Sequence, residues 1–278
     1  MTGKRLKKIS WFFVLCCIGI FFLFPIFWMA STAFKTVEQT TMFPPRLLPH
    51  PFTLRSFVTG FESGSFLRYF CNSAIVTGGC VIGNLLSCSL VAYGFARLEA
   101  RFKNILFTLL LSTMMIPSTV TLLPLYNIYS KLHWINTFYP LIVPSFFAVS
   151  AFNVFLLRQF FVTMPKELGE AASIDGCNAF QIFSKIYLPN AKAGLIVIII
   201  FTFTQVWNDY FNPMIYLKDY KKFTMAIGLS FFKNQYSTSI DIGPLMAMSL
   251  VSVVPILIVF VIFQKYFVQG IAVSGLKE

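Results

Sequence analysis

Residues 242–264 read IGPLMAMSLVSVVPILIVFVIFQ and contain no charged side chain. A single charge at the centre of a bilayer costs roughly 2.5–3.5 kcal/mol on insertion scales, so a run of this length is typical of a membrane-spanning segment. One crossing helix needs about 20 apolar residues. An open sheet would leave backbone groups without partners in lipid, and the run therefore predicts a transmembrane helix.

The rest of the chain repeats this pattern, and Asp209 is the only acid within any of the apolar windows. The predicted spans lie at about 10–33, 69–96, 105–126, 139–157, 193–217 and 243–264. Six helices leave only short connections, so we expect no fused soluble domain. The sequence predicts an all-α, polytopic membrane protein with six transmembrane helices, in which residues 1–278 form a single transmembrane domain.

The composition and the distribution of charge agree with this fold class. Of the 278 residues, 57% are hydrophobic and 12% are charged, which is about half the charged content of a soluble domain. The net charge is +12, but the cations are scattered among apolar segments, so nucleic-acid binding is not expected. Lys4, Arg5, Lys7 and Lys8 precede the first span. The positive-inside rule then places the N-terminus in the cytoplasm, and an even number of spans returns the C-terminus to that side.

Cysteine and histidine show no spacing that indicates a metal site. None of the six cysteines forms a CxxC pair, and the two histidines, His50 and His133, lack ligand-spaced neighbours. We therefore expect neither a bound metal nor a disulfide framework. The sequence also lacks HExxH and a GxSG-type serine within a span, which argues against an intramembrane enzyme.

The most polar of the segments predicted to lie inside the cell is the loop at 158–192, between the fourth and fifth spans. Thr163, Pro165 and Glu167 form a helix-start signal, with Thr163 as the capping residue, and predict a helix over 165–174. Asp175-Gly176 should end this helix, because glycine can adopt the left-handed conformation that follows a helix.

A second helix is predicted at about 178–187, just before Pro189. Ala179, Ile182, Phe183 and Ile186 recur at helical spacing, which gives this helix one apolar face. The residues alone leave two interpretations open. The two short helices could be a knob that a partner grips, or an amphipathic hairpin on the membrane surface.

The loop carries a motif that favours the first interpretation. Glu170-Ala171-Ala172, Asp175-Gly176 and Leu188-Pro189 resemble the EAA loop of ABC importer permeases. Other segments resemble the carbohydrate branch of these permeases, the second permease subunit of maltose-type importers. They are Pro44-Pro45 with Thr53-Leu54, Asn72-Ser73, the run from Ala92 to Arg97, and Trp207-Asn208-Asp209-Tyr210.

The resemblance implies a type I ABC importer permease in a bacterial cytoplasmic membrane. Such a chain would pair with a second, homologous permease, two ATPase subunits that bind ATP-Mg, and an extracytoplasmic sugar-binding protein. It would bind no cofactor and catalyse no reaction itself, and the sequence has no GxxxxGK[ST] phosphate loop. ATP-driven movement of the loop would produce alternating access. The residues implied in ATPase coupling are Glu170, Ala171, Ala172, Asp175, Gly176, Phe180 and Phe183.

A sugar pathway needs amide or hydroxyl partners and aromatic faces more than charge. Trp207, Asn208, Tyr210 and Asn212, near one end of the fifth span, are the candidates, together with Asn153 in the fourth. An interfacial aromatic belt is the alternative for the two aromatic residues. For Asp209, the alternatives to a functional role are a helix cap and an ion pair with Arg68 or Lys218.

The predicted function is import of a sugar or oligosaccharide. One alternative is an ABC permease for another solute such as a glycerol-phosphate ester, which would favour Arg or Lys along the pathway, and the spans contain none. A secondary transporter is a further alternative, but it would normally place an ionisable group near the midplane.

Overall fold

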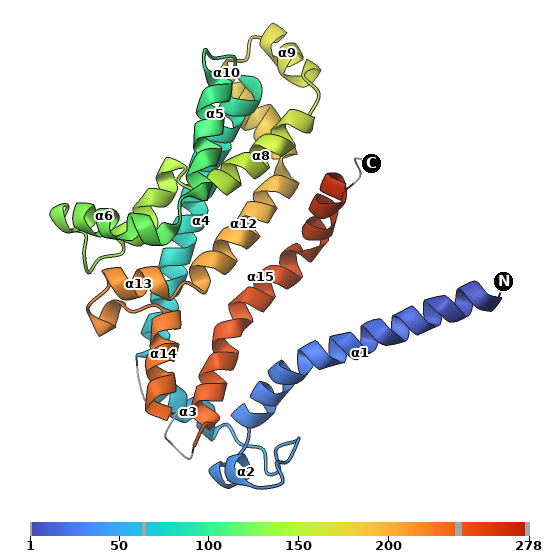
Figure 1. Cartoon of the computed structure of the whole chain (residues 1–278), viewed down its shortest axis with the longest axis vertical. Helices are drawn as coiled ribbons and strands as arrows, with labels where there is room; N and C mark the ends of the chain where they lie inside the picture. The colour runs from blue at the N-terminus through green and yellow to red at the C-terminus, as the bar shows by residue number, and fades with distance from the viewer. Residues whose placement is uncertain (1, 63–64, 237–240, 276–278) are drawn as a thin grey trace. The chain divides into compact units, whose positions relative to one another are not determined.

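The computed structural model describes residues 2–62, 65–236 and 241–275 (Figure 1). Every regular element in these ranges is a helix, and none is a strand, which confirms the all-α fold class. The α-helices are α1 (Thr2–Ala33), α2 (Val37–Thr41), α3 (Arg55–Glu62), α4 (Phe66–Arg97), α5 (Lys103–Ser112), α6 (Ser118–Lys131), α7 (Tyr139–Ile142), α8 (Ala151–Thr163), α9 (Glu167–Ile174), α10 (Ala179–Gln181), α11 (Leu188–Asn190), α12 (Lys192–Trp207), α13 (Phe211–Tyr216), α14 (Met225–Tyr236) and α15 (Gly243–Gly275). The 3₁₀ helices are η1 (Thr113–Met115), η2 (Val143–Phe147) and η4 (Tyr220–Lys222), and η3 (Ile182–Tyr187) is a π-helix.

Four helical segments in the described part of the chain are long and apolar enough to cross a membrane. They are Lys7–Ala33, Phe66–Arg97, Tyr139–Thr163 and Gly243–Lys265. Two further pairs pass the same test together but are bent, Lys103–Met115 with Ser118–Lys131 by 99° and Ala179–Asn190 with Lys192–Trp207 by 77°. Counting each pair as one span gives six, and these segments overlap the six predicted windows.

Three of the predicted windows are not continuous helices. The window 105–126 breaks before Pro117, where Ile116 is extended because a residue before proline disfavours the helical conformation. The window 139–157 contains η2 and then Ala148 in the left-handed region, at φ 52°, before α8 begins. The window 193–217 breaks between Trp207 and Phe211. The last two breaks lie beside a cavity described below.

The chain folds as two compact units, which we describe separately. Unit 1 comprises Met1–Leu67 and Gly228–Pro255, and unit 2 comprises Arg68–Ile227 and Ile256–Glu278. In unit 1, Lys35 is 3% exposed, and its Nζ donates to the Arg46 carbonyl at 2.6 Å and lies 4.4 Å from the Trp28 ring centre. Burial lowers the pKa of the Lys35 ammonium below its ordinary value. These contacts attach the proline-rich segment 42–54, which forms no helix, to the end of α1.

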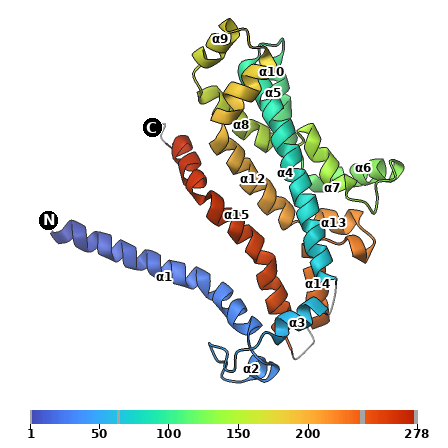
Figure 2. The same ribbon diagram turned by 180° about the vertical axis from the view of Figure 1, so that it is seen from behind.

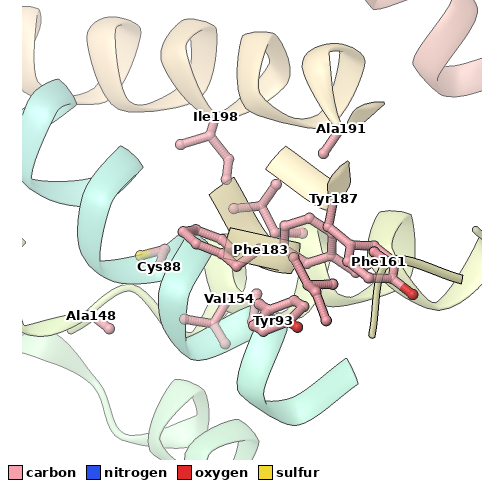
Figure 3. Close-up of a cluster of buried hydrophobic side chains, with 13 residues drawn as sticks. Cys88, Tyr93, Ala148, Val154, Phe161, Phe183, Tyr187, Ala191 and Ile198 are labelled. Carbon is pink, nitrogen blue, oxygen red and sulfur yellow. The ribbon is translucent and has the colours of Figure 1, made fainter. Parts of the chain in front are cut away.

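Unit 2 contains a hydrophobic core where α4, α8, α12 and the 158–192 loop meet (Figure 3). In Figures 1 and 2, α9 and α10 lie at one end of α12 and α13 lies at the other. The two candidate sites therefore lie at opposite ends of this helix. The core consists of Cys88, Ala92, Tyr93, Ala148, Val154, Leu157, Phe161, Ala172, Ile182, Phe183, Tyr187, Ala191 and Ile198.

Candidate functional site

The first helix of the 158–192 loop is α9, which begins at Glu167 and ends at Ile174. The predicted helix started two residues earlier, and the capping role predicted for Thr163 is wrong. Thr163 is the last residue of α8, and its hydroxyl donates back to the Phe160 carbonyl at 2.8 Å. The helix continues through Thr163 because its side chain bonds within the preceding turn rather than to the next helix.

The turn after α9 has the geometry that the sequence predicts. Gly176 has φ +83°, and the amides of Gly176 and Cys177 donate to Ser173 and Ala172 at 3.1 and 2.9 Å. A Cβ at Gly176 would meet no atom within 4 Å. The constraint at this position is therefore the backbone conformation itself, which glycine adopts without steric cost.

The second helix of the loop differs from the prediction in its hydrogen bonding. It begins with a capping box, in which the Asn178 side chain accepts from the Gln181 amide and the Gln181 side chain accepts from the Asn178 amide, both at 2.9 Å. It continues through the π-helix η3 and the short α11, so Pro189 lies inside the helix rather than ending it. Periodicity of apolar residues does not signal a π turn.

Aromatic rings attach this second helix to the rest of unit 2 (Figure 3). Tyr93 of α4 lies 5.2 Å from Phe183 and 5.5 Å from Tyr187 between ring centres, and its hydroxyl donates to the Ala179 carbonyl at 3.4 Å. Ile182 and Phe183 are buried as the predicted apolar face requires, whereas Ala179 is exposed. On α9, Gly169 approaches Tyr187 so closely that a Cβ would lie 2.9 Å from its hydroxyl oxygen.

The predicted coupling residues divide into a buried set and an exposed set. Ala172 and Phe183 belong to the core. Phe180 is 66% exposed and Ile174, which the sequence did not single out, is 86% exposed. The loop thus combines a packed base with an apolar tip. The other exposed members of the predicted set are Glu170, Ala171, Asp175 and Gly176.

Two arginines, Arg97 and Arg158, connect α4 with α8. The Arg97 guanidinium donates to the carbonyls of Phe161 and Met164, at the end of α8, and lies 4.7 Å from the Tyr187 ring centre. In return, Arg158 Nε donates to a carbonyl near the end of α4, that of Phe95, at 3.3 Å. Each arginine thus supplies donors to carbonyls at the end of the other helix, where cationic donors are favourable.

A polar cavity of about 380 Å³ lies at the other end of α12, within unit 2. Side chains from α4, α6, α8, α12 and α13 line it, together with the two helix breaks at 143–150 and 208–210. The polar lining residues are Asn84, Tyr129, Ser145, Ser150, Asn153, Thr202, Gln205, Asp209, Asn212 and Tyr216.

Of the five predicted pathway residues, Asn153 and Asn212 line this cavity and three do not. Trp207 is buried against Phe203 and Phe70, at 5.5 and 5.3 Å between ring centres. The side-chain amide of Asn208 donates back to the Thr204 carbonyl at 2.9 Å, and Tyr210 is exposed.

Asp209 also lines the cavity, and its contacts are those of a helix cap. Its carboxylate accepts from the amides of Phe211 and Asn212 at 3.1 and 3.2 Å, and from the Asn212 side chain at 2.8 Å. This geometry supports the capping alternative. Asn84 and Gln205 were not predicted to line a pathway, and their only signal is an amide within an apolar run. In the described residues, no group of three or more His, Cys, Asp or Glu could hold a metal ion.

Comparisons with known proteins agree with these features. A family model described as binding-protein-dependent transport system inner membrane component matches residues 86–273. The arabinooligosaccharides transport system permease protein AraQ of Halalkalibacterium halodurans is 34% identical over 100% of this chain and 100% of its own. The trehalose/maltose transport system permease protein MalG of Thermococcus litoralis is 27% identical over 100% of this chain and 99% of its own.

A solved structure shares the fold. It is a chain of a bacterial ABC transporter involved in the import of the acidic polysaccharide alginate, with a TM-score of 0.84 and 24% identity over 96% of this chain and 98% of that one. This likeness confirms the type I permease fold. With the family model matching more than half of the residues, the chain belongs to the family of binding-protein-dependent transport system inner membrane components, the permease proteins of ABC transporters.

Proposed function

We propose that this chain is one of two permease subunits of an ATP-driven importer that moves a sugar or oligosaccharide across the membrane by alternating access. Separate ATPase subunits would bind ATP-Mg and seat the 158–192 loop, and an extracytoplasmic binding protein would deliver the solute. The names of the relatives support a sugar as the solute, since they describe permeases for arabinooligosaccharides and for trehalose and maltose. Both termini and the loop would face the cytoplasm, with the six predicted windows as spans.

The observation that carries this proposal is the division of the loop into a packed base and an exposed apolar tip. Ile174 and Phe180 expose large apolar surfaces at a position where Gly176 fixes the turn between the helices. The base below them is continuous with α4, α8 and α12 through Tyr93, Phe183 and Tyr187. A partner that grips the tip would therefore move several membrane helices together.

Co-purification from membranes in mild detergent tests the proposal. The wild-type chain should carry a second permease and an ATPase, and Gly176→Pro should lose the ATPase, because proline fixes φ near −65° where Gly176 requires a positive value. Ala179→Pro is the matched control. It places proline at the first position of α10, after the extended Asn178, where proline is tolerated. If the wild-type chain purifies alone and transports without ATP, the proposal is wrong.

A further inference from the structure

We infer that the polar cavity of unit 2 binds an uncharged, polyhydroxylated solute and rejects anionic sugars such as uronates or sugar phosphates. This assignment rests on the proposed import function, which it deepens by naming the class of sugar. It adds Asn84 and Gln205 to the residues that would contact the solute.

The first support is a set of side-chain amides that line the cavity and leave donors or acceptors without protein partners. Within the described residues, the Gln205 side chain makes no hydrogen bond, and the Asn84 side chain makes one, which it accepts from the Cys88 thiol at 3.5 Å. Asn153 donates to the Thr202 hydroxyl at 3.4 Å, which leaves its carbonyl oxygen available. Polar groups in a membrane bundle need partners, so the cavity must hold water or hydroxyl groups.

The second support is the course of the backbone. Two of the three helix breaks in unit 2 border the cavity, with Ser145 and Ser150 in or after η2 and Asp209 between α12 and α13. Irregular backbone at membrane depth is tolerated where it lines a protein-enclosed or water-filled cavity, and broken helices commonly form solute sites in transporters. The volume of about 380 Å³ lies in the range of small-molecule sites.

The third support is the charge and shape of the lining. None of the lining residues, which all lie between Val76 and Tyr216 in a fully described range, is Lys, Arg or His, and Asp209 is the only acid. Its carboxylate already accepts three hydrogen bonds at the start of α13, so it is held as a cap rather than offered to a cation. Its negative charge still disfavours an anion nearby.

Aromatic rings complete the site. Tyr129 and Tyr216 line the cavity in an edge-to-face pair, with ring centres 5.3 Å apart. Rings of this kind combine an apolar face with a polar tip, and so can cover the C–H face of a sugar while the amides pair with its hydroxyls.

The test uses the assembled importer in nanodiscs, without ATP, carrying Gln205→Cys with the six native cysteines replaced. A hydrophilic thiol reagent should modify the new thiol, and neutral pentose or hexose oligosaccharides should protect it, whereas uronic-acid oligosaccharides of equal length should not. A thiol that does not react, or that no neutral oligosaccharide of the panel protects, overturns the inference. Equal protection by the uronic-acid compounds does so as well.

Uptake into proteoliposomes provides the second measurement, with the native cysteines in place. Gln205→Leu and Asn84→Leu should each lower the apparent affinity for a neutral oligosaccharide roughly tenfold, the loss of about one hydrogen bond. Thr204→Val, on the same helix but outside the cavity, should leave it unchanged. If all three variants behave alike, the cavity is not the site. If neutral oligosaccharides protect the thiol but uptake by the same complex needs no ATP, the cavity assignment stands and the proposed coupling to ATPase subunits is wrong.

Discussion

The 158–192 loop and the polar cavity share α4, α8 and α12, yet one is filled with side chains and the other is hollow. At the loop, Val154 and Phe161 of α8 are completely buried among rings. At the cavity, Asn153 of the same helix faces polar neighbours. A tightly packed base transmits displacement because it has little free volume, whereas a polar hollow can exchange water for solute. On the two proposals above, the same helix would serve a mechanical role at one end and a recognition role at the other.

The largest effect that would test this contrast concerns two phenylalanines of the loop. Phe183 is 5% exposed and Phe180 is 66% exposed, with ring centres 6.2 Å apart. Phe183→Ala should lower the free energy of unfolding of the purified chain by about 3–5 kcal/mol, because it leaves a cavity in the core. Phe180→Ala should change it by less than about 0.5 kcal/mol but reduce the ATPase that co-purifies. Equal destabilisation by both variants would contradict the division into base and tip.

A smaller effect is expected at the link between α4 and α8. Arg97→Gln removes charge-assisted bonds to two carbonyls and the contact with Tyr187, and should cost about 1.5–3 kcal/mol. The amount of solute transported per ATP hydrolysed should fall, whereas the amount of ATPase that binds should change less. The reason is that the loop would still bind the ATPase but would move without α8. Arg97→Lys should restore only part of this ratio, since lysine lacks the planar fork. The control is Arg101→Gln, because Arg101 is exposed and lies over the ring of its neighbour Phe102. If Arg97→Gln transports as much solute per ATP hydrolysed as the wild type, Arg97 does not couple the loop to α8.

The smallest effect concerns the cavity side, at the cap of α13. Asp209→Ala should destabilise this helix by about 1 kcal/mol, and Asp209→Asn by a few tenths, because asparagine also caps well. Hydrogen exchange is the suitable measurement, since the amides of Phe211 and Asn212 donate to Asp209. Both amides should exchange faster in the alanine variant only. If these two amides exchange at the wild-type rate in Asp209→Ala, the hydrogen bonds to Asp209 do not stabilise α13.

The accuracy of the sequence-based predictions follows the same contrast. The loop could be predicted because its signals are local: a glycine with positive φ, a helix end at Ile174, and two apolar residues, Ile182 and Phe183, on one face. The cavity could be predicted only in part, since its lining comes from segments between Val76 and Tyr216 that no local pattern connects. An aromatic ring near one end of the fifth span suggested Trp207 as a pathway residue, but this ring packs against Phe70 of α4. Tertiary packing decided that orientation.

The arginine link shows a different limit of sequence reasoning. In the sequence, Arg97 and Arg158 are cations beside predicted spans, where the positive-inside rule alone would be enough to explain them. Only the folded chain shows that each donates to carbonyls at the end of the other's helix. A charge that satisfies a topological rule can therefore also hold helices together.

The number of residues in the π-helix η3 sets the rotation of the residues that follow it. A π turn closes hydrogen bonds over five residues rather than four, so it contains one residue more than the α-helical path. Deleting one residue between Ile182 and Tyr187 would favour an ordinary helix and rotate all later residues by about 100° relative to the preceding ones. Thr202 and Gln205, further along in α12, would then turn away from the cavity. The orientation of the α12 side chains toward the cavity should therefore survive substitutions in η3 better than the deletion or insertion of a residue there.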